Sequence, residues 1–108
     1  MSDWVRVIDK SKLSPHGLTS IEVDGRRICL ASAGGTLFAV DDRCTHAEAL
    51  LSSGDVEEGE VVCPLHGARF DLKTGEAMTP PATRPVQTHE VKIDGNGVFV
   101  RLRGPNLG

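Results

Sequence analysis

The stretch CTHAEALLSSGDVEEGEVVCPLH, from Cys44 to His66, holds two of the chain's three cysteines and two of its four histidines. They form two pairs, Cys44-x-His46 and Cys63-x-x-His66, with sixteen residues between the pairs. Each pair is short enough for one loop to direct both side chains toward one point. Sixteen residues suffice for a hairpin that returns the second loop beside the first. Two thiolates and two imidazoles in this pattern predict a metal centre.

Two kinds of metal centre use two cysteines and two histidines. In a structural zinc site, the usual spacing pairs Cys with Cys and His with His. In a Rieske [2Fe–2S] centre, two Cys bind one iron and two His bind the other. Because each loop of this chain supplies one Cys and one His, the mixed pairing favours the iron–sulfur centre.

Length, composition and charge predict one small soluble domain spanning residues 1–108. Three cysteines in such a chain suggest metal ligands or free thiols rather than a disulfide framework. A net charge of -3 and only 4% aromatic residues argue against a nucleic-acid partner. No segment is apolar for long enough to suggest a signal peptide or a membrane anchor, so we expect a cytoplasmic protein.

The hydrophobic pattern predicts an all-β protein, an antiparallel sandwich or barrel. Hairpin signals at Asp24-Gly25 and Gly95-Asn96 separate runs that alternate apolar and polar residues. The expected strands lie within residues 4–8, 20–32, 36–40, 60–63, 68–72, 89–94 and 97–102.

Both ends of the chain are expected to build one β-sheet base, from residues 1–41 and 81–108. Residues 42–80, which hold the four ligand-type side chains, are expected to form a small insert. The one helical candidate is a short turn over residues 45–51. The proline-rich piece TPPATRP (79–85) closes the insert.

The remaining cysteine and histidines have no partner at ligand spacing. Cys29 lies in the middle of a predicted strand and is interpreted as structural. His16, between Ser14-Pro15 and Gly17, is expected in a loop. His89 begins a predicted strand and is expected to be exposed.

The two boxes Cys44-Thr45-His46 and Cys63-Pro64-Leu65-His66-Gly67 resemble those of the Rieske family. The resemblance extends through residues 68–76 to Pro80-Pro81, which is similar to the proline loop that covers the cluster in this family. Respiratory and photosynthetic Rieske proteins have an extra Cys in each loop, and this chain has neither. Within the family, it most resembles the ferredoxin components of bacterial multicomponent aromatic-ring dioxygenases.

This resemblance implies a Rieske fold whose inserted subdomain binds one [2Fe–2S] cluster. Cys44 and Cys63 would bind the inner iron, and His46 and His66 the outer iron. The chain would be an electron carrier rather than an enzyme. Its expected partners are a flavin-dependent ferredoxin reductase and a terminal oxygenase, and a monomer is expected because a shuttle must dissociate quickly.

The residues around the boxes suggest further roles. Four loop residues are interpreted as apolar cover that keeps water from the sulfurs: Leu50, Leu51, Leu65 and Pro80. The acidic run at Asp55, Glu57, Glu58 and Glu60 is either a solvated turn or a surface that steers toward basic partners.

High-potential members of the family place a Ser and a Tyr near the second box, where their hydroxyls donate to sulfur. Ala68 and Phe70 match these positions and cannot donate. We therefore expect a potential at the low end of the Rieske range, about -150 mV.

Two alternative functions stay open at this stage. One is the small Rieske subunit of an assimilatory nitrite reductase, although many of those lack the full ligand set. The other is a zinc-binding interaction module, against which the mixed Cys/His pairing and the flank LHGARFD argue.

Overall fold

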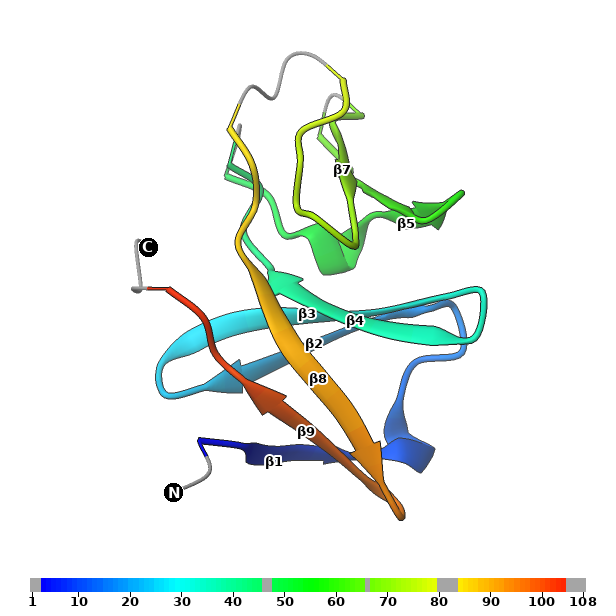
Figure 1. The fold of residues 1–108 in the computed structure, drawn as a ribbon. Coiled ribbons are helices and arrows are strands. Elements are labelled where there is room, and N and C mark those ends of the chain that lie inside the picture. Colours follow the sequence, from blue (N-terminus) through cyan, green and yellow to red (C-terminus); the bar gives the residue numbers. More distant parts are fainter. Residues whose placement is uncertain (1–2, 46–47, 66, 80–83, 105–108) are drawn as a thin grey trace.

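The computed structural model describes residues 3–45, 48–65, 67–79 and 84–104, which consist mainly of strands and turns (Figure 1). The elements in chain order are β1 (Val5–Asp9), η1 (Lys10–Lys12), β2 (Leu18–Val23), β3 (Arg26–Ala33), β4 (Thr36–Asp41), η2 (Leu51–Ser53), β5 (Asp55–Glu57), β6 (Glu60–Val62), β7 (Arg69–Asp71), β8 (Thr88–Asp94) and β9 (Gly97–Arg101). Both helical segments are single 3-10 turns, and no helix in the described ranges is long and apolar enough to cross a membrane. The predicted all-β class is confirmed.

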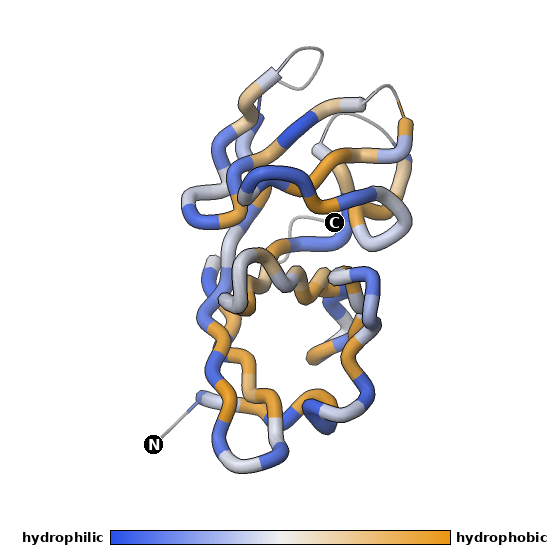
Figure 2. Tube along the Cα trace, turned by 90° about the vertical axis from the view of Figure 1, so that its right-hand side faces the viewer, coloured by the Kyte–Doolittle hydropathy of each residue, from blue (hydrophilic) through white to orange (hydrophobic). Residues whose placement is uncertain are grey.

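The strands form two antiparallel sheets. Six strands from both ends of the chain make the base, in the order β1-β9-β8-β4-β3-β2. Figure 2 shows the base end-on, with its strands curled into a ring. Three short strands, β5-β6-β7, form a separate sheet that lies above the base in Figure 1. The junction between the two sheets runs through the segments that follow β4 and precede β8.

Strand β3 is the layer that the two halves of the molecule share. Ile28 and Leu30 pack with Val98 and Val100 in the interior of the base. The alternate residue Cys29 faces the other way and packs in a second cluster of buried residues with the insert. A strand covered on both faces is expected to be a continuous apolar run rather than an alternating one. Residues 28–31 (ICLA) form such a continuous run, so the alternation predicted for this strand does not hold there. Cys29 is a core residue, in agreement with its interpretation as structural.

The hairpin turns follow from residues that tolerate positive φ. Asp24 and Gly25 have φ values of 50° and 78°, as a type I′ turn between β2 and β3 requires. Glu58 and Gly59 have φ values of 51° and 77° and connect β5 to β6. Strand β5 is not among the strands predicted from the sequence. Its three residues are too few to give a period-two signal.

The predicted helical turn at residues 45–51 is wrong for the residues that the structure describes. The 3-10 turn begins at Leu51 instead, and residues 46–47 lie outside the described ranges. The reason is tertiary, because the Leu51 N–H donates to the Asp42 carbonyl at 2.6 Å. This bond sets where the turn begins.

The expectation that His89 is exposed is also wrong. Its side chain has no exposed surface and lies between Asp41 of β4 and Arg103, which follows β9. Nδ1 accepts the Arg103 backbone N–H at 2.9 Å, so the ring proton is on Nε2, which donates to Asp41 Oδ1 at 2.7 Å. Both partners are distant in sequence, and a strand-initial histidine carries no local signal of them.

Gly75 joins the insert to the base at a point of close approach. Its N–H donates to Asp71 O at 2.7 Å, and its carbonyl accepts the Val86 N–H at 2.8 Å. Its φ is 80°, and a Cβ there would lie 2.1 Å from Val86 O. Gly59 has nearly the same φ, 77°, but a Cβ there would meet nothing within 4 Å.

We predict that Gly59→Ala costs about 1–2 kcal/mol, the strain of a side chain at positive φ. Gly75→Ala should cost at least about 2 kcal/mol more, because the backbone must also move to relieve the clash. Urea unfolding followed by far-UV circular dichroism measures both. Equal costs for the two variants would contradict the close approach at Gly75.

Candidate metal centre

The first cysteine loop follows directly from β4. The Cys44 N–H donates to Ala49 O at 2.9 Å, and Arg43 and Leu50 form an isolated antiparallel bridge. These contacts close a loop that starts and ends at adjacent points. Cys44 lies at the base of this loop, where the main chain is best fixed.

The second cysteine loop connects β6 to β7. Val62 pairs with Arg69, and beyond this pair the Cys63 N–H donates to Ala68 O at 2.7 Å. This loop too is closed by a backbone hydrogen bond from its cysteine. The two boxes of the sequence thus become two loops of similar construction.

The structure brings the two cysteines together in one buried cluster. Cys44 is 2% exposed and Cys63 is 1% exposed, and both are free thiols. Burial raises the pKa of the Cys63 thiol, the Leu65 N–H lowers it by donating to the sulfur, and the neighbouring Cys44 raises it again. Two thiolates side by side at low dielectric need positive charge to compensate them. This donor pair therefore fits a metal centre.

The two predicted histidine ligands, His46 and His66, lie outside the described residues. Within the described ranges, no three His, Cys, Asp or Glu side chains are grouped so that they could hold a metal ion. Their assignment therefore rests on the spacing Cys44-x-His46 and Cys63-x-x-His66.

The predicted apolar cover is uneven. Leu51 is completely buried in the same cluster as the two cysteines, whereas Leu50 is half-buried. Leu65 is 42% exposed, and Pro80 lies outside the described residues. Of the predicted cover residues, Leu51 is therefore the one that packs in the buried cluster of the thiols, and Leu65 presents apolar surface to solvent from within the second loop.

Both ends of the proline-rich segment are attached to the cysteine loops. Thr45 Oγ1 donates to Arg84 O at 2.8 Å, and Arg84 Nη2 donates back to Thr45 O at 3.1 Å. On the other side, the Arg69 N–H donates to Thr79 Oγ1 at 3.1 Å, and the Met78 N–H donates to Arg69 O at 2.8 Å. The segment between these anchors includes Pro80 and Pro81, which lie outside the described residues.

The acidic run is partly neutralised. Arg69 Nε lies 2.7 Å from Glu60 Oε1, and Arg69 Nη1 lies 3.7 Å from Glu57 Oε1. Two of the four carboxylates thus pair across the small sheet, and the run is not simply a solvated turn.

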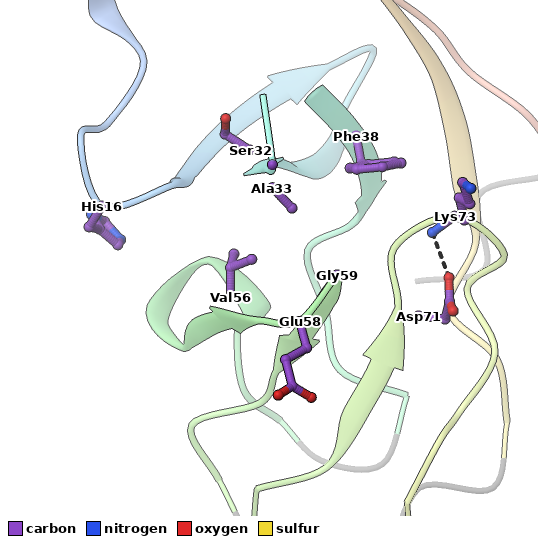
Figure 3. A pocket seen from close by; sticks show the side chains of 10 residues that line it. His16, Ser32, Ala33, Phe38, Val56, Glu58, Gly59, Asp71 and Lys73 are labelled. Carbon is purple, nitrogen blue, oxygen red and sulfur yellow. Dashed lines mark hydrogen bonds between the residues drawn. The ribbon is translucent and has the colours of Figure 1, made fainter. Parts of the chain in front are cut away.

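An open groove of about 650 Å³ lies between the base and the insert (Figure 3). Ala33 and Phe38 line it from the base, and Val56 and Glu58 line it from the β5–β6 hairpin. Neither Cys44 nor Cys63 is among its lining residues, so the groove is distinct from the candidate metal centre.

Sequence reasoning missed Asp42, which is completely buried two residues before Cys44. Its carboxylate accepts from Ser20 and Ser52, one in the base and one beside the cysteine loop. The dipeptide Asp41-Asp42 carried no sign that its second carboxylate would turn inward.

Comparison with known proteins agrees with this site. The Rieske [2Fe-2S] domain family matches residues 3–90. The ferredoxin component of the naphthalene 1,2-dioxygenase system of Pseudomonas aeruginosa is 34% identical over 99 residues, which cover 92% of this chain and 95% of that protein.

Solved structures show the same architecture. The ferredoxin of carbazole 1,9a-dioxygenase from Nocardioides aromaticivorans IC177 has a TM-score of 0.86 at 36% identity, covering 94% of this chain and 100% of that one. A chain in the complex of reduced oxygenase and oxidized ferredoxin in carbazole 1,9a-dioxygenase has a TM-score of 0.83 at 28% identity, covering 94% of each chain. The resemblance drawn from the two Cys/His boxes is confirmed.

We predict that Leu51→Ala destabilises the protein by about 2–5 kcal/mol, the usual cost of a cavity at a fully buried leucine. The cavity would open beneath the thiols, so visible absorbance should be lost at a lower urea concentration as well. Leu50→Ala is the matched control and should cost clearly less, because Leu50 is half-buried. Equal losses would contradict the packing role of Leu51.

Proposed function

Because the chain belongs to the Rieske [2Fe-2S] domain family, we propose that it is the ferredoxin component of an aromatic-ring dioxygenase system. In this role it carries one electron at a time and catalyses no reaction on the substrate itself. The observation that carries the proposal is the pair of free, buried cysteines at the bases of two hydrogen-bonded loops.

The protein's cofactor is a Rieske-type [2Fe–2S] cluster, which when bound supplies a site that takes up and releases a single electron. We assign Cys44 and Cys63 to one iron and His46 and His66 to the other. Cys44 and Cys63, the two assigned ligands that the structure describes, fit such a cluster, because both are buried free thiols that lie next to each other.

The chain's own residues position and shield the centre. The closed loops orient Cys44 and Cys63, and the Leu65 N–H donates to the Cys63 sulfur. Hydrogen bonds to a ligand sulfur stabilise its negative charge and so favour the reduced state. Leu51 packs in the same buried cluster as the two cysteines and helps to keep water from it.

Partner proteins would approach the end of the molecule that carries the two loops. Leu65 and Met78, 42% and 43% exposed, provide apolar surface near the second loop. Arg43 and Arg84 are exposed near the first loop. An apolar patch with charged residues around it suits a transient interface. We propose a flavin-dependent reductase and a terminal oxygenase as its two partners.

The remaining assignments follow from this role. The base would comprise residues 1–41 and 81–108, and the cluster-binding insert residues 42–80. We propose a cytoplasmic monomer, because a carrier that serves two partners must leave each of them quickly. The relatives support this reading over a nitrite reductase subunit or a zinc-binding module.

The test is electron paramagnetic resonance of the dithionite-reduced protein, with iron and acid-labile sulfide counted on the same sample. A Rieske-type signal with two irons and two sulfides per chain is expected. Cys44→Ser and His46→Ala should abolish it, and His16→Ala, at a histidine outside the boxes, should not. A colourless protein that holds one zinc would overturn the proposal.

We predict that Ala68→Ser and Phe70→Tyr each raise the reduction potential from about -150 mV. Both residues are completely buried beside the second loop, and each variant adds a hydroxyl that can donate to sulfur. Protein-film voltammetry measures the shift. Phe38→Tyr adds the same hydroxyl at the groove, whose lining includes neither cysteine, and should leave the potential unchanged. No rise in either loop variant would contradict the assignment of these positions.

A further inference from the structure

Asp42 is a buried carboxylate that joins the base to the first cysteine loop. Oδ2 accepts from Ser20 Oγ and from Ser52 Oγ, both at 2.8 Å, and Oδ1 accepts the Ser52 N–H at 2.7 Å. Ser20 belongs to β2 and Ser52 to η2. Three donors from two distant parts of the chain thus converge on one side chain that is 0% exposed.

The main chain of Asp42 makes the same connection. Its N–H donates to Arg27 O at 3.1 Å, and its carbonyl accepts the Leu51 N–H at 2.6 Å. Cys44 follows two residues later, so the start of the first loop has little freedom to shift relative to the base.

The charge of this carboxylate has no direct counter-ion among the residues that the structure describes. The guanidinium of Arg27 reaches only Ser20 Oγ, at 3.4 Å, and Arg27 is itself exposed. The neighbouring Asp41 differs, because Arg26 lies 3.6 Å from it and His89 donates to it. Burying an unpaired charge costs several kcal/mol, which here only hydrogen bonds offset. Such a residue is expected to have a role beyond packing.

The field of Asp42 extends into the cluster of residues that contains the thiols. Burial raises the pKa of the Cys29 thiol, and the charge of Asp42 raises it further. Cys29 packs in the same buried cluster as Cys44 and Cys63. A negative charge in this low-dielectric region opposes the arrival of an electron nearby.

We propose that Asp42 is a positioning residue that holds the first cysteine loop and, through its buried charge, keeps the reduction potential of the centre low. The inference rests on the proposed function, because it needs the cluster at these loops. It adds a contribution to the potential that is independent of hydroxyl donors at positions 68 and 70.

The substitution Asp42→Asn separates the hydrogen bonds that hold the loop from the charge that acts on the potential. The asparagine amide oxygen retains the Ser52 N–H, and its NH2 group donates to the two serine hydroxyls, which can accept as well as donate. Asp42→Asn therefore keeps the hydrogen-bonded shape and removes the charge. Ser52→Ala does the reverse, because it removes a hydrogen bond and keeps the charge.

The experiment measures the potential of the cluster-loaded variants by voltammetry and their signals by electron paramagnetic resonance. Asp42→Asn is expected to raise the ratio of reduced to oxidised protein about tenfold at a fixed potential, which is 59 mV for a one-electron couple. Ser52→Ala should lower stability and leave the potential unchanged or lower. Glu48→Gln is the exposed control, since the Glu48 side chain is 89% exposed and pairs with Arg43, and its removal should change little.

The inference is overturned if Asp42→Asn leaves the potential unchanged, or if Ser52→Ala raises it as much, which would indicate loop displacement instead of charge. If the Asp42→Asn variant does not assemble the cluster, the potentials of Asp42→Glu and Asp42→Gln are compared instead. These two side chains have nearly the same shape, and only the glutamate carries a charge. Equal potentials in that pair would then reject the inference. Failure of the wild-type protein to show a Rieske signal would instead reject the proposed function.

Discussion

The burial of two thiols at the junction of two small sheets is the constraint on which the rest of the structure depends. Cys44 and Cys63 lie in the same cluster of buried residues as Cys29 of β3. Thiolates in such surroundings are unfavourable without a compensating positive charge. The base keeps the thiols buried, and a bound metal centre supplies the positive charge that they need. Strand β3 is shared by both parts, because one of its faces packs in the base and the other packs with the insert.

The loops that carry the cysteines are held by contacts outside themselves. Each is closed by one backbone hydrogen bond, and each is then attached to one end of the proline-rich segment. Asp42 attaches the first loop to the base. A rigid site favours electron transfer, because less energy is needed to rearrange its surroundings when its charge changes. A small protein with a modest core thus obtains a rigid centre from polar contacts between segments that are distant in sequence.

Two buried polar networks among the residues that the structure describes differ in their electrostatics. Asp41 and Arg26 carry opposite charges that compensate each other, and His89 adds a hydrogen bond to Asp41. Arg26 and His89 also hold residues 103–104. Asp42 has hydrogen bonds alone. Adjacent acids in the sequence therefore carry different roles, the first in closing the base and the second beside the metal centre.

The sequence by itself determined the fold class, the hairpin turns and the family. Strand periodicity, the Asp24-Gly25 and Gly95-Asn96 turns and the spacing of the two Cys/His boxes are local signals, and local signals can be read from one chain. Only the tertiary structure decided that His89 is buried, that η2 begins at Leu51, that β5 exists and that Asp42 turns inward. Strand β5 is too short to give a periodic signal, and the other three depend on hydrogen-bond partners outside their own segment, which act only after folding has brought them near.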